Sequence, residues 1–595
     1  QGTNERIYLP PTPIQEKLAK SEIPGQNPII EMNQNSKDLV SGRGYGFKYW
    51  HELFTDRQLI ALDTFSDLVK EVREHAKNDA IVAGMEDDGN GLNEGGVGAT
   101  AYAEAISLYL ALAVDRFSDY WTSMGRWQSA NQQFSNMFGR QAIPMVWDYP
   151  EANPFSAKGG SALNLLNWTI QSIPNLGIGC IGKSEQADAS KQLISINKVV
   201  STDPPYYDNI AYADLSDFFY IRLRQSLSSI FPNLFTTMSV PKIEEIVALS
   251  HRHGNKKRAE NFFLESMKQA MQQIGNQAHP SFPVTIYYAF KQSETKGNAG
   301  TVRTGWETFL NAIIESGFAI TGSWPVRTEL SNRMTGIGTN VLSSNIVLVC
   351  RKQTTERVNI SRQEFSSALR KDFAEAVKLQ QIGNIAPVDL AQAAIGPGMA
   401  IYTRYSKILD ASGNTLSVRD ALSLIAQTID EVLHEQETEF DPETRFAIRW
   451  FEEAEFFEGD YGMAQGLAIA TNVSVEGVAE AGVIKSSQGK VKLLSPDELS
   501  ADWNPTSDTR LTVWEVVHHL IKNLDIGEES AARIYSNITA EIAQLAKELV
   551  YRLYSTCEQK NSATEAHRYN TLIQSWPEIE RLARLETPAQ QGSLL

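Results

Sequence analysis

The spacing of apolar and polar positions divides the chain into regions of different predicted structure. Residues 1–45 show no sustained period and are rich in Pro, Asn, Gly and Gln, which predicts a linker or an extended arm. Thr55 and Gln58 form a capping box that opens a helix. The apolar run at 105–114 is too short for a membrane helix, which needs about 20 residues, so it predicts a buried core helix. Residues 46–150 are therefore predicted to be a helical region.

From residue 151 the pattern changes to short apolar runs that alternate with helices, as in an α/β sheet. The β-branched run at 194–200 stops at Asp203, where two prolines end a strand because they donate no backbone N–H. Three more runs predict further strands, at 284–290, 318–322 and 345–350. Residues 151–355 are therefore predicted to be α/β, with Asp203 at the carboxyl end of a strand, where open α/β sheets bind ligands.

The remaining residues, 356–595, are predicted to form a mainly helical, acidic C-terminal domain. They hold 22 basic and 36 acidic residues, a net charge of −14 out of the total of −17. Residues 1–355 therefore carry only −3. Because a local basic groove matters more than the total charge, the acidity does not exclude nucleic-acid binding by the earlier regions.

The composition is ordinary for a globular chain, with 42% hydrophobic and 21% charged residues. Only three cysteines occur, at 180, 350 and 557, and none belongs to a C-x-x-C pair. This predicts a reducing, cytoplasmic location and no zinc ribbon within these residues. No metal site is predicted, because His518-His519 and His251-x-His253 are better explained as core or surface histidines. No stretch predicts a membrane partner. The chain begins with Gln1, and we expect it to be a fragment of a longer protein.

The most informative stretch is D-P-P-Y at 203–206. An adenine amino group is a weak nucleophile, and methylating it requires acceptors for both of its N–H bonds. The Asp203 carboxylate and the Pro204 carbonyl offer two acceptors, Pro205 stiffens the turn, and Tyr206 offers an aromatic face for a base flipped out of a duplex. The alternative is a plain turn, because X-P-P-Y also occurs in loops.

D-P-P-Y-Y-D-N resembles the fourth motif of amino-group DNA methyltransferases. Longer strings, among them A-Y-A-D-L-S-D-F-F-Y, G-S-W-P-V-R-T-E and A-A-I-G-P-G-M-A, resemble the large prokaryotic adenine-specific DNA methylases that carry a zinc-ribbon module and are often encoded near defence genes. This chain is similar to the C-terminal two-thirds of that family. The resemblance implies that 151–355 form a partial Rossmann-like methyltransferase sheet, flanked by mainly α-helical regions.

The resemblance also implies site residues. Asp203, Pro204, Pro205 and Tyr206 would be catalytic, and S-adenosylmethionine would be the methyl donor. Asp188 would receive the adenine of that cofactor, although a surface acid is an equal alternative. The substrate would be duplex DNA with a flipped base, and proteins encoded in the same defence operon would be partners in phage defence or restriction–modification.

The sequence departs from that family in one respect. The glycine-rich D-x-F-x-G-x-G loop that holds the cofactor is missing from these 595 residues, and we expect it upstream. The missing loop leaves open a non-catalytic DNA-binding or assembly subunit. Because other methyltransferases use similar turns, a cytosine-N4, RNA or protein-glutamine methyltransferase is a further alternative.

Basic residues suggest where DNA phosphates would bind. The densest cluster follows the motif and includes Arg252, Lys256, Lys257 and Arg258, for which a solvated helix end is the alternative. Arg327, after Trp324, is a second candidate.

Overall fold

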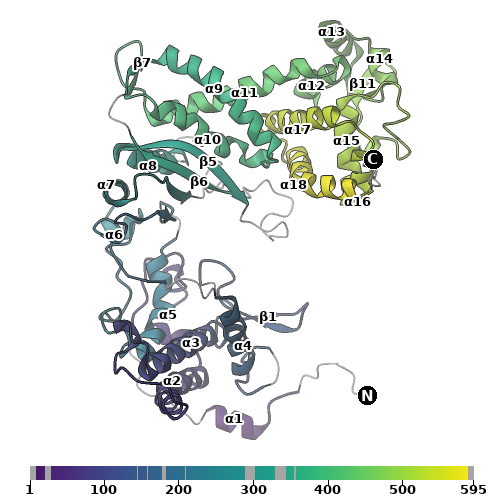
Figure 1. Cartoon of the computed structure of the whole chain (residues 1–595). Helices are drawn as coiled ribbons and strands as arrows, with labels where there is room; N and C mark the ends of the chain where they lie inside the picture. The colour runs from purple at the N-terminus through teal and green to yellow at the C-terminus, as the bar shows by residue number, and fades with distance from the viewer. Residues whose placement is uncertain are drawn as a thin grey trace, which may run out of the picture. The chain divides into compact units, whose positions relative to one another are not determined.

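The computed structural model contains two compact units (Figure 1). One unit comprises 1–188 with 207–263, and the other comprises 189–206 with 264–595. The expected boundary after 150 falls inside the first unit, and the one after 355 falls inside the second. The structure describes residues 9–20, 29–143, 145–156, 159–176, 182–207, 210–288, 302–327, 344–353 and 357–586.

The first unit is mainly helical, with one short hairpin. Thr55 and Gln58 form the predicted capping box, because the Thr55 hydroxyl accepts from the Gln58 amide at 3.3 Å and the Gln58 side chain accepts in return. The apolar run at 105–114 lies in the third helix, which packs against its neighbours through the buried Phe117 and Trp121. The elements are α1 (Pro13–Ala19), α2 (Asp56–Val82), α3 (Ala99–Tyr120), β1 (Arg126–Gln128), β2 (Gln133–Ser135), α4 (Ala162–Ser172), α5 (Tyr212–Leu227) and α6 (Ser250–His253).

A small four-stranded sheet with helices packed against it lies in the second unit, which confirms a mixed α/β region. The strand order is β3-β4-β6-β5, where β3 runs parallel to β4, and β6 runs antiparallel to both of its neighbours. The boundary between the two units falls inside α7. The elements are β3 (Ser201–Thr202), α7 (Lys256–Gln277), β4 (Val284–Tyr288), α8 (Val302–Glu315), β5 (Phe318–Arg327) and β6 (Ser344–Lys352).

The apolar lead-in at 194–200 is not the buried strand that its pattern predicts. Strand β3 contains only two residues, and among the described residues it pairs only with β4. Asn197 adopts a left-handed backbone with φ of 54°, which interrupts an extended run. No other described strand pairs with the segment before β3. Its apolar side chains are therefore more than half exposed, namely Ile194, Ile196 and Val199.

Helix α10 (Pro387–Thr403) packs unusually closely against β5. Gly396 permits this contact, because a Cβ there would lie 2.6 Å from the backbone nitrogen of Ser323 and would overlap the Ser323 side chain. The Ser323 hydroxyl donates to the Ala393 carbonyl of the same helix at 2.7 Å. Packing between α10 and β5 therefore requires a glycine at position 396, the first glycine of the G-P-G sequence.

We expect Gly396→Ala to destabilise the protein by about 1–3 kcal/mol, because an added methyl group would force α10 away from β5. Gly466→Ala is the matched control, since a Cβ at this helical position meets no atom within 4 Å. That control should be neutral or slightly stabilising. Thermal melting of both variants measures the difference, and equal melting temperatures would contradict the packing role.

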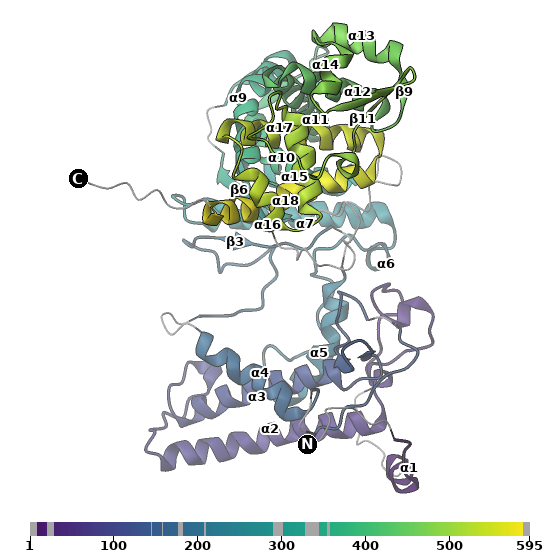
Figure 2. The same ribbon diagram turned by 90° about the vertical axis from the view of Figure 1, so that its right-hand side faces the viewer.

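The C-terminal part of the second unit is a helical assembly with three small strands. Helices α17 and α18 lie side by side in Figure 1 and Figure 2, and α15 packs against both of them. Two further strands, β7 and β8, pair in parallel nearer the sheet. The elements are β7 (Asn359–Ser361), α9 (Arg362–Ile382), β8 (Lys407–Leu409), α11 (Val418–Glu435), α12 (Pro442–Ala454), β9 (Gly459–Asp460), α13 (Tyr461–Thr471), α14 (Val475–Glu480), β10 (Ile484–Ser487), β11 (Lys490–Leu493), α15 (Val513–Leu524), α16 (Glu528–Tyr535), α17 (Ala540–Lys560) and α18 (Ala563–Glu586).

Three buried titratable residues lie on α15, namely Glu515, His518 and His519, and the pKa values of His518 and Glu515 are shifted furthest. The His518 ring contacts the Trp514 carbonyl at 2.7 Å and the Tyr569 hydroxyl at 3.0 Å, and burial lowers its pKa to about 3. Burial raises the pKa of Glu515 to about 8, although its carboxylate accepts from the Thr512 hydroxyl at 3.0 Å. Both side chains are therefore neutral inside the folded protein near pH 7.

The raised pKa of Glu515 makes stability depend on pH. The folded state holds the proton up to about pH 8, whereas the unfolded state releases it near pH 4.5, so stability is lost as the pH rises through this interval. In Glu515→Gln this loss is absent. The stability of the variant relative to the wild type should therefore increase by on the order of 3 kcal/mol between pH 4.5 and pH 8. Denaturant unfolding at the two pH values measures the change, and a pH-independent difference would contradict it.

Candidate active-site turn and basic cluster

The D-P-P-Y turn directly follows β3, at the carboxyl end of the parallel strand pair. Ser201 pairs with Thr285 and Thr202 with Ile286, and the turn begins at the next residue. Pro204 is buried, whereas Asp203 is exposed. The predicted position of the turn after a strand is therefore confirmed, but that strand is short and lies at an edge of the sheet.

The Asp203 carboxyl group hydrogen-bonds to Tyr206 of the same motif. Partial desolvation by the surrounding chain has the larger effect and raises the Asp203 pKa above its usual value, while a hydrogen bond with the Tyr206 side chain favours the charged form. The carboxylate thus retains access to solvent while one partner orients it.

A pair of aromatic residues supports the Tyr206 ring. Tyr206 meets Tyr288 edge to face at 5.3 Å between ring centroids, and Tyr288 stacks on Phe309 at 4.0 Å with 15° between the planes. Tyr288 ends β4 and Phe309 lies on α8, and both are buried. Sequence reasoning missed these two residues as supports of the site. The apolar patterns place them in a strand and a helix, but only the fold brings them to the turn.

The residues after Tyr206 are held within the first unit. The Tyr207 carbonyl accepts from the Ala248 amide at 2.7 Å, and its ring meets Phe263 at 5.2 Å. Tyr207 has a φ of 28°, a region that non-glycine residues rarely adopt. The chain therefore makes a sharp, anchored bend where it passes from one unit to the other. Asp208 and Asn209 lie outside the described residues.

Asp188, the candidate for the cofactor adenine, is half-buried and is the last residue of its section of the first unit. The described residues before it, 182–187, form no strand. The apolar run at 178–181, which precedes Asp188 in the sequence, lies outside the described residues. Asp188 therefore belongs to the first unit, and Asp203 belongs to the second.

Arg252 is committed to an ion-pair network inside the first unit. Its guanidinium contacts Glu245 at 2.5 Å and Asp214 at 3.2 Å, and the Asp214 side chain is fully buried. Glu245 also accepts from the Ala213 amide at the start of α5. The Arg252 side chain is 10% exposed, so this geometry does not favour the expected phosphate contact. The sequence shows a basic cluster but does not reveal which cation is paired internally.

The other three basic residues of the cluster occupy the first turn of α7 and are exposed. Asn255 precedes them, and its side chain accepts from the Arg258 amide at 2.9 Å. Lys256 lies 4.0 Å from Glu260, while Lys257 and Arg258 complete the exposed row. Cations at a helix N-terminus are disfavoured by the helix dipole, whereas an anion there is favoured. Arg327 is the last residue of β5, and its side chain lies outside the described part of the chain.

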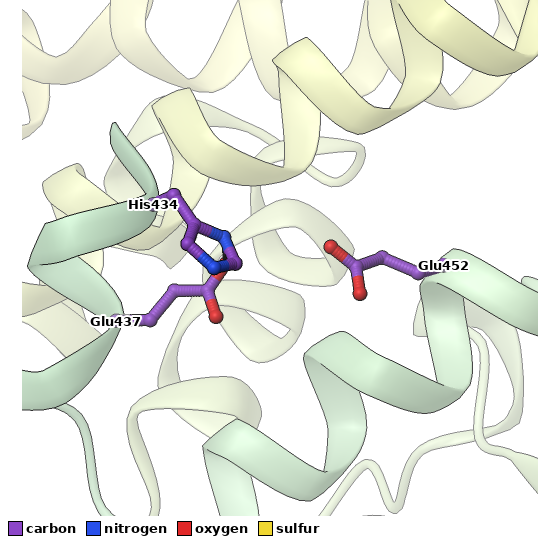
Figure 3. A group of neighbouring side chains, drawn as sticks. All are labelled: His434, Glu437 and Glu452. Atoms are coloured by element: carbon purple, nitrogen blue, oxygen red, sulfur yellow. Dashed lines mark ion pairs between the residues drawn. The ribbon is translucent and has the colours of Figure 1, made fainter. Parts of the chain in front are cut away.

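One group among the described side chains has ligand-like spacing for a metal: His434, Glu437 and Glu452, with donor atoms within 4.8 Å of one another (Figure 3). Two arginines already neutralise the carboxylates. Arg449 contacts Glu437 at 3.0 Å and Glu452 at 3.1 Å, and Arg552 pairs with both glutamates. A partly buried ion-pair network therefore explains why these three side chains lie close together. A cation placed there would meet two guanidinium groups.

Comparisons with known proteins give one match. Residues 441–594 match the family model described as "Domain of unknown function (DUF8807)". No curated protein and no solved structure matches the chain. Of the helices described, none combines the length and apolar character required to cross a membrane.

We expect Arg252→Gln to lower the free energy of unfolding by about 3 kcal/mol, because it leaves the buried Asp214 carboxylate and the partly buried Glu245 carboxylate without their cation. Lys257→Gln is the matched control at an exposed position, and its effect should stay within about 0.5 kcal/mol. Denaturant unfolding compares the two variants. A similar stability for both would show that Arg252 is not a structural residue.

Proposed function

We propose that this chain is part of an S-adenosylmethionine-dependent DNA methyltransferase that modifies the N6 amino group of adenine. The observation that carries the proposal is the D-P-P-Y turn at the carboxyl end of β3, where an oriented, accessible Asp203 lies beside a supported tyrosine ring. The carboxyl ends of parallel strands are where open α/β sheets bind their ligands.

The chemistry requires two acceptors on one amino nitrogen. The Asp203 carboxylate accepts from one N–H, and the Pro204 carbonyl accepts from the other, which draws the nitrogen away from conjugation with the ring. S-Adenosylmethionine supplies the electrophilic methyl group when it is bound. Positioning does most of the remaining work, because the sulfonium is already a good leaving group.

Tyr206 is proposed to stack on the flipped base. A base outside the duplex loses its stacking partners, and an aromatic side chain replaces one of them. Because Tyr288 packs against the Tyr206 ring and is itself stacked on Phe309, the ring is supported from inside the sheet. A fixed ring loses little side-chain entropy when the base arrives.

The strand order is consistent with part of a doubly wound sheet. The parallel pair β3 and β4 matches two strands on one side of a topological switch point, and β3 is then the strand at that point. This would place the turn beside the half of the sheet that holds the cofactor. Asp188 remains the proposed residue for the cofactor adenine.

Duplex DNA is the proposed partner, with phosphates bound by Lys256, Lys257 and Arg258. These exposed cations lie where the α7 dipole favours an anion, so a phosphate oxygen is a fitting ligand. Arg327 stays a candidate of the same kind. A role in phage defence or restriction–modification, with partners from the same operon, is proposed by resemblance alone.

A second candidate is a non-catalytic DNA-binding or assembly subunit. It is favoured by the lack of a glycine-rich cofactor loop within residues 1–595. Both candidates include DNA binding, and only the first includes methyl transfer.

The proposal is tested by an assay that follows the transfer of labelled methyl groups from S-adenosylmethionine to duplex DNA. The assay uses the complete protein. Asp203→Ala should reduce the rate at least about a hundredfold, because an acceptor needed in the transition state is lost. Asp203→Asn keeps one acceptor oxygen and should retain more activity than the alanine variant. Asp502→Ala removes an exposed aspartate outside the proposed site and should leave the rate unchanged.

Equal transfer by the wild type and Asp203→Ala would refute the role of Asp203. DNA binding without transfer to any duplex would favour the second candidate. Mass spectrometry of the digested product distinguishes N6-methyladenine from N4-methylcytosine, and RNA or a glutamine-containing protein as methyl acceptor covers the remaining alternatives.

A further inference from the structure

Residues 442–493 form a helix–turn–helix followed by a β-hairpin, within the region that matches the domain of unknown function. Helix α12 leads into the short strand β9, helices α13 and α14 follow, and β10 with β11 closes the module. The strand order is β10-β11-β9, so the hairpin pairs back onto the strand between the first two helices. Figure 1 and Figure 2 both show these elements grouped together.

The module has the local features of a helix–turn–helix. Three residues join α13 to α14, and the first of them, Asn472, ends α13 in a left-handed conformation with φ of 60°. The Ser474 hydroxyl caps α14 by accepting from the Gly477 amide at 3.0 Å. Beneath the helices, Trp450 is fully buried and lies so close to Gly459 that a side chain at 459 would collide with it.

The exposed face of this module lacks the charge that DNA binding requires. Neither α13 nor α14 contains a Lys or an Arg. The second helix, which enters the major groove in DNA-binding proteins of this type, exposes Glu476 and Glu480. These carboxylates would lie among phosphates if α14 entered a groove, and the repulsion would oppose binding.

The hairpin does not compensate for this lack of positive charge. Two of its three lysines are paired with acids, Lys490 with Asp460 and Lys492 with Glu498. Arg510 is the cation beside α14, and it is shared between Glu480 and Glu443, so the group remains negative. The whole matched region, 441–594, holds 24 acidic and 14 basic residues, a net charge of −10.

The module also exposes large apolar side chains. Ile469 on α13 is 76% exposed, and Phe457, in the loop before β9, is 74% exposed. The exposed side chains of the module therefore include both apolar and negatively charged groups. A partner with apolar side chains flanked by Lys or Arg complements it in both respects.

We propose that this helix–turn–helix module is a protein-docking module, which binds a basic amphipathic helix of a partner protein through Ile469, Glu476 and Glu480. The partner's apolar row packs on α13, and its cations pair with the acids of α14. This mode is a helix laid on an apolar surface with a charged rim, in which electrostatic complementarity selects the partner. The proposal does not depend on methyltransferase activity.

Fluorescence anisotropy with the full chain tests the proposal, using a synthetic amphipathic helix of leucine and lysine as the probe. The wild type should bind it saturably with one-to-one stoichiometry, and should not bind the same peptide with glutamate in place of lysine. The double substitution Glu476→Lys with Glu480→Lys should weaken binding at least about tenfold. Ile469→Asp should weaken it separately, which covers the case in which charge reversal disturbs folding.

The control for general electrostatics is Glu71→Lys with Glu74→Lys on the exposed face of α2, which changes the net charge by the same amount. This control should keep most of the affinity. Equal peptide binding by the wild type and both module variants would overturn the proposal, as would the lack of peptide binding by the wild type.

The competing possibility is that the hairpin binds DNA. The affinity of the full chain for duplex DNA should not change when Lys485 and Lys490 are both replaced by alanine. A fall of about tenfold in that affinity, with a weaker salt dependence, would assign the module to DNA and overturn the proposal.

Discussion

The contact between the Tyr206 ring and Tyr288 is the interaction on which the candidate site depends. A turn after a two-residue edge strand receives little support from strand pairing alone. The ring contact connects it to β4, and the stack of Tyr288 on Phe309 extends that support to α8. Since Tyr206 also hydrogen-bonds to Asp203, the position of the carboxylate follows from aromatic packing inside the sheet.

Buried ion pairs are the second constraint on the structure. Asp214 is fully buried and obtains its cation from Arg252, which a reading of the sequence assigns to DNA. In the C-terminal part, Arg552 forms ion pairs with the buried Glu437 and with the partly buried Glu452. A charge removed from water must find an opposite charge or a set of hydrogen bonds. Arg252, which the sequence suggests as a DNA contact, is therefore occupied in an internal ion-pair network, whereas the basic residues in the first turn of α7 and the acids of α14 are exposed.

Local signals predicted local structure well. The capping box at Thr55 and Gln58 and the apolar run at 105–114 both lie where the sequence places them, because capping bonds and helical periodicity involve residues a few positions apart. The strand run at 194–200 shows the limit of such signals. β-Branched residues favour a strand only when neighbouring strands enclose them, and among the described residues β3 has a neighbour on one side.

The sequence by itself determined the capped helix after Thr55, the helix at 105–114, the turn at D-P-P-Y and the acidity of the C-terminal region, because these depend on residue type and short-range spacing. Only the tertiary structure decided that Arg252 is paired internally, that Tyr288 and Phe309 support the turn, and that Ile469 on α13 and the two glutamates of α14 are exposed. These features arise from contacts between residues far apart in the chain. Pairing, burial and exposure are properties of such contacts, and no single stretch of sequence contains them.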